Sequence, residues 1–264
     1  MKALSWTATR LMAPLFCLGL AGVALPAAAG EFSAAQSKEI GDIVRDYLVN
    51  NPEVLRDAMV ELDRREKAEQ AAAREKVLTD NAEKLFSSAH QAVIGNPTGK
   101  VTLVEFFDYN CGYCKKSLDD LAKLMKDDPN LRVVLKDFPV LGPGSVEAAQ
   151  VASALRNQFT GDKFWTFHQK LLMTRGQVGK AQAVAIAKEM GADMGKLDRD
   201  MASPDVRTGI QETMQLADGL NLTGTPSWVV GKEVVVGAVG YDELKGKIGN
   251  VASNVAKCGK AVCS

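Results

Sequence analysis

The stretch VTLVEFFDYNCGYCKKSLDDL, from Val101 to Leu121, begins as a β-rich apolar run and continues as a charged segment with leucines at helical spacing. Between the two parts stand Cys111 and Cys114, separated by two residues. A second β-rich run, LRVVLKDFP, follows from Leu131 to Pro139. Strand, helix and strand in this order predict a βαβ unit with parallel strands and a right-handed crossover. Cys111 then lies where the first strand ends and the helix begins.

This position of Cys111 favours redox chemistry. A sulfur at the start of a helix lies near unpaired backbone N–H groups and the positive end of the helix dipole, which stabilise a thiolate and lower its pKa. We predict that Cys111 attacks a substrate disulfide and that Cys114, one turn further along, resolves the mixed disulfide. No cofactor is implied other than this disulfide pair.

Two other interpretations of the pair are a structural disulfide and a metal site. A disulfide within CxxC closes so short a loop that it stabilises the fold little. A metal site needs two more ligands, and Cys258 and Cys263 are spaced more loosely than in a usual zinc knuckle. The two histidines, His90 and His168, lie elsewhere in the sequence. We therefore predict no metal site and expect Cys258 and Cys263 to bridge each other, with a second redox pair as the alternative.

Residues 1–29 have the features of a secretory signal peptide. Lys2 and Arg10 precede an apolar segment, and a small-residue run ending at Ala29 forms an A-x-A cleavage site. We expect cleavage after Ala29, which removes Cys17 and leaves four of the five cysteines. An exported chain in an oxidising compartment can keep a CxxC pair as a disulfide, so export supports the redox interpretation.

Composition argues against several other classes of protein. The chain has 32 basic and 32 acidic residues, and loss of Lys2 and Arg10 leaves the mature chain close to neutral. This balance gives no support for a nucleic acid partner or an anionic membrane surface. Four cysteines are too few for a disulfide-built scaffold, so a hydrophobic core must hold the fold.

Residues 30–90 are predicted to form a helical region. Apolar residues recur at helical spacing from Ile40 to Leu62, with a break at Asn50-Asn51-Pro52. The segment from Asp63 to Lys76 is charged and rich in alanine, which suits a solvated helix. A helix from Glu53 to Ser87 would be about 50 Å long. The apolar stripe needs a partner, and we predict a second copy of the chain; the alternative is that it folds back on the chain's own globular domain.

Residues 91–264 are predicted to form a thioredoxin-like domain. A helical block at about 143–221 separates the βαβ unit from two further β-rich runs. These runs, Pro226–Gly231 and Glu233–Val239, are expected to form a hairpin, and a final helix follows from Tyr241 to Ala256. The predicted fold class is α/β, a thioredoxin-like fold with an inserted helical domain, preceded by a helical oligomerisation segment.

Aromatic residues inside the helical block are predicted to belong to the core. The sequence KFWTFH, from Lys163 to His168, places Phe164, Trp165, Phe167 and His168 on one helix. Such a cluster can be mistaken for a binding site. It is more typical of a packing face.

Three motifs resemble those of the DsbA-like branch of periplasmic thiol-disulfide oxidoreductases. They are VEFFDYNCGYC, LKDFPVLGPGS and TGTPSWVVG, in this order, and the resemblance covers Val101 to about Gly249. The helical region before them resembles the amino-terminal segment of oligomeric proteins related to the suppressor-of-copper-sensitivity ScsC proteins. The resemblance implies a periplasmic protein, exported cysteine-containing proteins as substrates and a membrane thiol-disulfide redox partner. It also favours a trimer.

The same resemblance implies roles for residues outside CxxC. The bond between Thr225 and Pro226 is expected to be cis, with Thr225 facing Cys111 and offering backbone groups to an extended substrate peptide. Glu105 corresponds to a buried acidic residue that is paired with a lysine, for which Lys136 is the candidate. We expect Glu105 to relay the proton that Cys114 must lose; the alternative is an exposed glutamate on an edge strand.

The residues between the two cysteines bear on the direction of the reaction. Gly112 and Tyr113, expected to contact substrate, resemble the pair found in the disulfide isomerase DsbC rather than the Pro-His of DsbA. Tyrosine adds no positive charge beside the thiolate, which predicts a less oxidising pair. Together with the helical region, this favours a disulfide isomerase or reductase. A DsbA-like dithiol oxidase is the alternative, and a copper-binding thiol protein is a weaker one.

Overall fold

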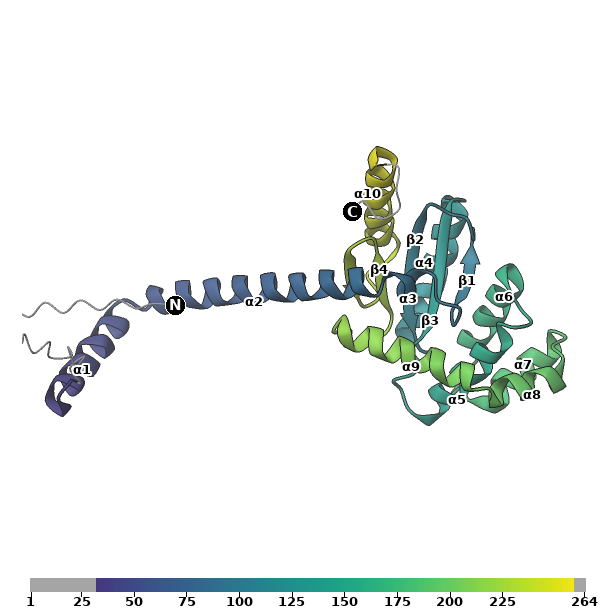
Figure 1. Ribbon diagram of the computed structural model, residues 1–264, viewed down its shortest axis with the longest axis horizontal. Helices are drawn as coiled ribbons and strands as arrows, with labels where there is room; N and C mark the ends of the chain where they lie inside the picture. Colours follow the sequence, from purple (N-terminus) through teal and green to yellow (C-terminus); the bar gives the residue numbers. More distant parts are fainter. Residues whose placement is uncertain (1–31, 259–264) are drawn as a thin grey trace, which may run out of the picture. The chain divides into compact units, whose positions relative to one another are not determined.

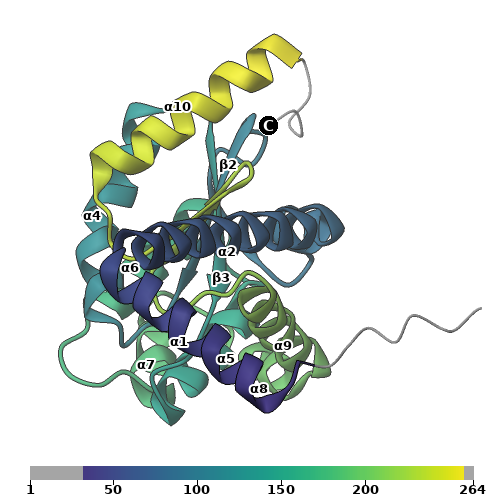
Figure 2. The same ribbon diagram turned by 90° about the vertical axis from the view of Figure 1, so that its left-hand side faces the viewer.

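The computed structural model describes residues 32–258 of the chain, and side chains up to residue 254. It divides into two compact units, an amino-terminal unit that ends at Leu62 and a main unit that starts at Asp63. Figures 1 and 2 show the elements of both units. Among the described residues, no helix combines the length and the apolar character that crossing a membrane requires.

The amino-terminal unit contains helix α1 (Ala34–Asn50) and the first turns of α2 (Glu53–Asp80). Ser33 and Gln36 form a capping box at the start of α1, and the break predicted around Pro52 is confirmed. None of the side chains of α1 is buried. The exposed apolar residues of the unit include Ile40, Ile43, Val44, Tyr47, Leu55, Met59 and Leu62.

The helix that we predicted to run to Ser87 is interrupted. Helix α2 ends at Asp80, and a short helix α3 (Ala82–Phe86) follows. Asn81 separates them; its amide donates to the carbonyl of Val77 and so takes up a helix-end acceptor. Leu78 and Leu85 are buried in the core of the main unit, so this core begins before the domain boundary that we predicted at residue 90.

The main unit is built on a mixed five-stranded sheet in the order β1-β3-β2-β4-β5. Strands β2 and β3 are parallel and are joined by α4, which confirms the predicted βαβ unit, and the other neighbours are antiparallel. Strand β1 was not predicted, because its four residues carry no pattern of their own. The bounds are β1 (Ala92–Gly95), β2 (Val101–Phe107), α4 (Gly112–Asp127), β3 (Leu131–Asp137), β4 (Ser227–Val230) and β5 (Glu233–Val236).

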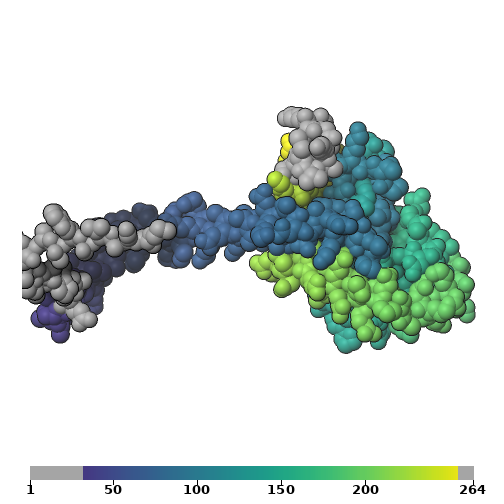
Figure 3. All heavy atoms as spheres, viewed as in Figure 1, coloured from purple at the N-terminus to yellow at the C-terminus, as the bar shows by residue number. Residues whose placement is uncertain are grey.

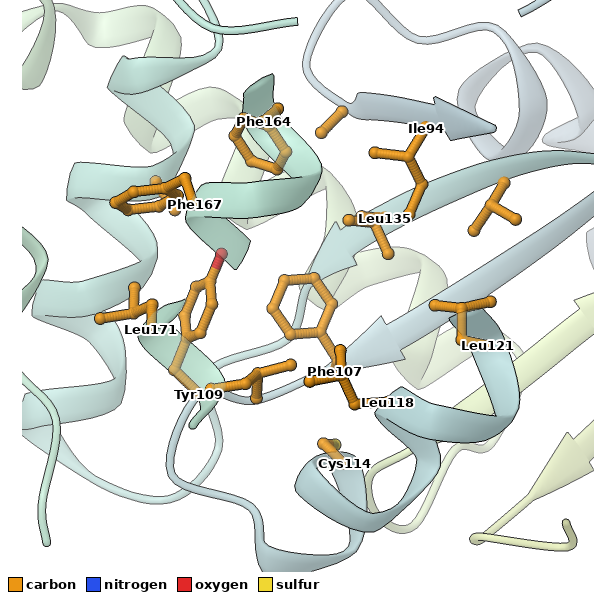
Figure 4. Packing of buried hydrophobic residues seen from close by; sticks show 14 of the residues in the cluster. Ile94, Phe107, Tyr109, Cys114, Leu118, Leu121, Leu135, Phe164, Phe167 and Leu171 are labelled. Carbon is orange, nitrogen blue, oxygen red and sulfur yellow. The ribbon is translucent and has the colours of Figure 1, made fainter. Parts of the chain in front are cut away.

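Helices cover both faces of the sheet. The face that carries Leu103, Phe107 and Leu135 packs against α4, the helical insertion and α10 (Tyr241–Cys258). We call this the thiol face, because Cys114 belongs to the same cluster. Figure 4 shows Phe107 among residues of α4 and of the insertion. The opposite face, which carries Phe106 and Val134, packs against α3, α9 (Pro204–Gly219) and the end of α2; we call it the α9 face. Helices α4 and α10 lie side by side (Figure 2), and the Tyr241 hydroxyl donates to Asp127 at 2.5 Å.

The predicted helical insertion is confirmed, with five helices where the sequence has four segments of helical periodicity, at 145–157, 162–174, 180–190 and 204–220. It contains α5 (Pro143–Leu155), α6 (Gly161–Leu172), α7 (Lys180–Glu189), α8 (Met194–Ala202) and α9 (Pro204–Gly219), of which α8 was not predicted. In the space-filling view its green atoms lie against the blue and teal atoms of the rest of the main unit (Figure 3). Phe164, Phe167 and His168 are buried, which confirms that the aromatic cluster is a packing face.

Candidate active site

Cys111 is the N-cap residue of α4. Its backbone is extended (φ −80°, ψ 117°), and its N–H donates to the carbonyl of Asp108 at 3.0 Å. Strand β2 therefore leads through one tight turn into the helix, as the sequence predicts. Only 6% of Cys111 is exposed, and its Sγ lies 3.1 Å from the carbonyl oxygen of Thr225.

The surroundings of Cys111 stabilise its thiolate. A hydrogen bond with the Cys114 thiol is the largest cause that lowers the pKa of Cys111, and it outweighs the opposing effect of burial. A hydrogen bond with the Thr225 side chain and the backbone N–H groups of Tyr113 and Cys114 lower it further. The pKa falls from 9.0 to about 5, so Cys111 is a thiolate at neutral pH.

Cys114 differs from Cys111 in every respect that matters for reactivity. It is fully buried, in the same cluster as Phe107 and Leu118 (Figure 4). The hydrogen bond that it gives to Cys111, its burial and the nearby Glu105 carboxylate all raise its pKa well above the ordinary value. Both cysteines are free thiols in this structure. The pair thus combines a reactive thiolate with a protonated, protected thiol.

Glu105 lies inside the sheet beneath the two cysteines. Its strand, β2, is the central one of five, and the side chain is 2% exposed, so the alternative of an exposed edge-strand glutamate is wrong. Its Oε2 atom is buried without a hydrogen-bond partner. Burial, and then the negative charge of Cys111, raise the pKa of Glu105 to about 8.

Lys136 is not the partner of Glu105, and our prediction of that pair is wrong. In the parallel register Glu105 lies opposite Leu135, whereas Lys136 lies opposite Phe106. Neighbouring residues of a strand point to opposite faces, so the carboxylate is on the thiol face and the ammonium on the α9 face. There Lys136 donates to the carbonyl of Lys84 at 2.5 Å and lies 3.6 Å from Glu212.

The Thr225-Pro226 peptide bond is cis, as predicted, and it brings Thr225 against Cys111. The Pro226 carbonyl accepts from Gly237 at 2.8 Å, which ties this turn to the segment after β5. Gly112 faces open space, and Tyr113 is 63% exposed. These two residues therefore lie at the surface next to the thiolate.

The loop before Cys111 contains functional candidates that our sequence analysis missed. Asp108 is buried, and its carboxylate accepts from the backbone N–H groups of Asn110, Val140 and Leu141 and from the Ser145 hydroxyl, at 2.7 to 2.9 Å. Polar residues between a buried strand and a cysteine are the only signal for this network in the sequence. Apart from Asn110, the residues with which the Asp108 carboxylate pairs lie 32 to 37 positions away.

No group of three or more His, Cys, Asp or Glu side chains that could hold a metal ion occurs among the described residues. Cys258 and Cys263, which we expect to bridge each other, lie outside the residues whose side chains the structure describes. Cys111 and Cys114 remain the chemical centre of the described part of the chain. Their arrangement is that of a thioredoxin-fold dithiol site.

Comparison with known proteins identifies the family. Residues 102–249 match the DSBA-like thioredoxin domain, and residues 36–69 match the Copper resistance protein ScsC N-terminal domain. The chain therefore belongs to the DSBA-like thioredoxin family and carries an amino-terminal region of the ScsC type.

Solved structures agree with this assignment. The chain is 39% identical to a thioredoxin-like oxidoreductase from Silicibacter pomeroyi DSS-3, with a TM-score of 0.61 over 65% of this chain and 97% of that one. It is 30% identical to a linker-deletion mutant of Proteus mirabilis ScsC, with a TM-score of 0.63 over 84% of this chain and 97% of that one.

Curated relatives match over part of their length. The thiol:disulfide interchange protein DsbA of Bordetella pertussis is 29% identical over 143 residues, which are 50% of this chain and 64% of that protein. The Na(+)/H(+) antiporter NhaA 1 of Salinispora arenicola is 29% identical over 140 residues, 52% of this chain. The chain spans only 21% of the length of that antiporter.

Proposed function

We propose that the protein catalyses thiol-disulfide exchange on exported proteins and acts mainly as a disulfide isomerase or reductase. The observation that carries the exchange activity is the unequal pair, a Cys111 thiolate beside a protonated, buried Cys114. The observation that favours isomerisation is an exposed apolar stripe on α1 and α2, in a region that matches the ScsC amino-terminal domain.

The reaction begins when the Cys111 thiolate attacks one sulfur of a substrate disulfide. The substrate S–S bond breaks, a mixed disulfide with Cys111 forms, and the other substrate sulfur leaves as a thiolate. In isomerisation a different substrate thiolate then attacks the mixed disulfide and releases Cys111 unchanged. In reduction Cys114 attacks Cys111, the substrate leaves as a dithiol, and Cys111 and Cys114 form a disulfide.

Glu105 has the properties of the base for the reductive step. Cys114 must lose its proton before it attacks, and the hydrogen bond to Cys111 and then burial raise its pKa above the ordinary value. With a pKa of about 8, Glu105 is mostly protonated near neutral pH while Cys111 is a thiolate. In the mixed disulfide the charge of Cys111 is gone, which lowers the pKa of Glu105 and frees its carboxylate to accept a proton more readily than an ordinary glutamate does. The unpartnered Oε2 atom is the acceptor in this proposal.

Self-association supports isomerisation because several thiolates can then engage one misfolded chain. The apolar residues of α1 are exposed in the structure, although such residues normally find a partner. We propose a homo-oligomer, with three copies as the state that the ScsC-type region favours. A monomeric mass in solution would favour the alternative, that the stripe packs on the main unit of its own chain.

Oxidation of reduced substrates is the second candidate function. A pKa of about 5 at Cys111 makes its thiolate a good leaving group, so a Cys111-Cys114 disulfide passes readily to a substrate dithiol. This property suits a DsbA-like oxidase, and DsbA from Bordetella pertussis is among the relatives.

The cellular location, the redox partner and the cofactor requirement belong to the same proposal. We propose a periplasmic location, a membrane thiol-disulfide partner that resets the Cys111-Cys114 pair, and no cofactor beyond that pair. Copper binding by the two thiols is a weaker alternative.

Reactivation of a scrambled, fully disulfide-bonded substrate tests the isomerase proposal. Mature protein and a truncation that starts at Asp63 are compared in a glutathione buffer, and the mass of each in solution is recorded. We expect the oligomeric mature protein to reactivate the substrate and the truncation to oxidise a reduced peptide without reshuffling. Equal reactivation by a monomeric truncation would contradict the role of the helices, and no exchange by either protein would contradict the activity itself.

A further inference from the structure

The residues on either side of the CxxC motif bind the same loop of the helical insertion. Asn110 precedes Cys111 directly, and Lys115 follows Cys114 directly. Both reach the segment 173–179, which connects α6 to α7 and which we call the brace loop. These contacts join positions 59 and 68 residues apart in the sequence.

Asn110 pairs with the carboxy-terminal half of the brace loop. Its Oδ1 accepts from the backbone N–H of Val178 at 2.7 Å, and its Nδ2 donates to the Val178 carbonyl at 2.9 Å. Nδ2 also lies 3.0 Å from the Ser145 hydroxyl. The amide therefore uses both ends on one residue of the loop, which fixes distance and orientation together.

Lys115 binds the other half of the brace loop. Its Nζ donates to the Thr174 carbonyl at 2.8 Å, and its own backbone N–H donates to the carbonyl of Cys111 at 3.1 Å. A charge-assisted hydrogen bond from a partly buried lysine is stronger than a neutral one. The brace loop thus holds the start of α4 on both sides of the CxxC motif, through Asn110 before it and through Lys115 after it.

The brace loop is itself fixed on the insertion. Val178 is buried, and a Cβ atom placed on Gly144 in α5 would come within 2.7 Å of its carbonyl oxygen. The Lys180 N–H donates to Glu147 at 3.1 Å just beyond the loop. The loop end that Asn110 binds therefore has little room to move.

We propose that Asn110 and Lys115 are positioning residues that hold Cys111 and the first turn of α4 in register with the Thr225 turn through the brace loop. The thiolate depends on hydrogen bonds from Cys114 and Thr225 and from the backbone at Tyr113, all of which need this register. The inference rests on the proposed exchange chemistry of Cys111 but not on isomerase activity. It assigns the helical insertion a role in setting the reactivity of the thiol.

Titration of the Cys111 thiolate by its ultraviolet absorbance tests this directly. Asn110→Ala and Lys115→Met should each raise the midpoint, the pH at which half of Cys111 is ionised. The double variant should raise it by about one pH unit, which reduces the fraction of thiolate roughly tenfold at a pH below the midpoint. Lys115→Arg keeps a donor for Thr174 and should restore the wild-type value. Lys116→Met removes a neighbouring charge without touching the brace loop and should leave the midpoint unchanged.

A remote variant separates positioning from local damage at the motif. Gly144→Ala pushes on the Val178 carbonyl from α5 and should raise the midpoint. Gln150→Ala, at an exposed position of the same helix, should not. A midpoint in the double variant and in Gly144→Ala that stays at the wild-type value would overturn the proposal. If the double variant does not fold, Lys115→Met, Lys115→Arg and Gly144→Ala give the same decision. Failure of the isomerase assay leaves these midpoints unaffected.

Discussion

The two faces of the sheet each bury an ionisable side chain, one register position apart, but only one of these side chains has polar partners for its charged group. Lys136 on the α9 face is 1% exposed, but the Lys84 carbonyl and Glu212 lie against its ammonium. Glu105 on the thiol face is 2% exposed and has a carboxylate oxygen without a partner. Burial shifts the pKa of both groups, that of Lys136 down to about 8 and that of Glu105 up to about 8. Only Glu105 has an oxygen without a partner, and it lies on the face of the two cysteines, where a shifted pKa can serve chemistry.

Replacement of Lys136 should give the largest effect, and on stability alone. Lys136→Ala removes the buried aliphatic part of the lysine side chain and leaves the Lys84 carbonyl and Glu212 without their cation. The free energy of unfolding should therefore fall by about 3 kcal/mol. Urea unfolding measures this loss, and Lys136→Met, which keeps the packing, should lose less. The thiolate midpoint of Cys111 should not change in either variant. A shift there would mean that the two faces are not independent.

Replacement of Glu105 should affect the reaction and spare the fold. Glu105→Gln cannot take the proton of Cys114, so decay of the mixed disulfide should slow by about 100-fold. The attack by Cys111 should remain at least as fast as in the wild type. Rapid-quench analysis of a mixed disulfide with a peptide separates the two steps. An unchanged rate of decay would remove Glu105 from the mechanism.

The pH dependence of stability sharpens the same comparison. The pKa of Glu105 is raised from 4.5 to about 8, so its burial costs nothing at low pH and destabilises the reduced protein increasingly between these values. The free energy of unfolding of the wild type should therefore fall relative to Glu105→Gln by about 1.4 kcal/mol per pH unit in this range. Urea titrations at pH 5 and pH 7 measure the difference. Parallel curves would show that the carboxylate is not buried in solution.

The smallest effect is expected from a buried group of the thiol face that does have a partner. Burial lowers the pKa of His168 to about 3, so the ring is neutral, and the Tyr109 hydroxyl lies 3.3 Å from its Nδ1 atom. Tyr109→Phe removes this contact and should cost about 1 kcal/mol or less. The rate of attack by Cys111 should stay the same. A slower attack would extend the reactive region into the aromatic cluster.

Much of the fold could be predicted because its signals are local. The run into Cys111, the two β-rich segments after Thr225 and the helical periodicity around Phe167 each define an element by neighbouring residues. Strand β1 and the short helix α8 could not be predicted in this way. Four residues such as Ala92–Gly95 become a strand only because β3 pairs with them.

In the candidate site, too, residues with a local signal could be predicted and contacts between distant residues could not. Cys111, Cys114 and Pro226 could be identified in the sequence because each has a chemistry that few residue types share. The partner of Lys136 could not, since a parallel register decides whether neighbouring residues of two strands point to the same face, and this register placed Glu105 and Lys136 on opposite faces.

Neighbouring residues alone show that a CxxC motif stands where a strand meets a helix, which is enough to make one cysteine reactive and the other protected. The distant groups that surround the pair are brought there only by folding. Asn110 and Lys115 meet one loop of the insertion because α6 packs beside the sheet. Among the described residues, no cation is one of the groups that shift the pKa of Glu105. Local chemistry is a property of neighbouring residues, whereas its tuning depends on contacts that form only when the chain has folded.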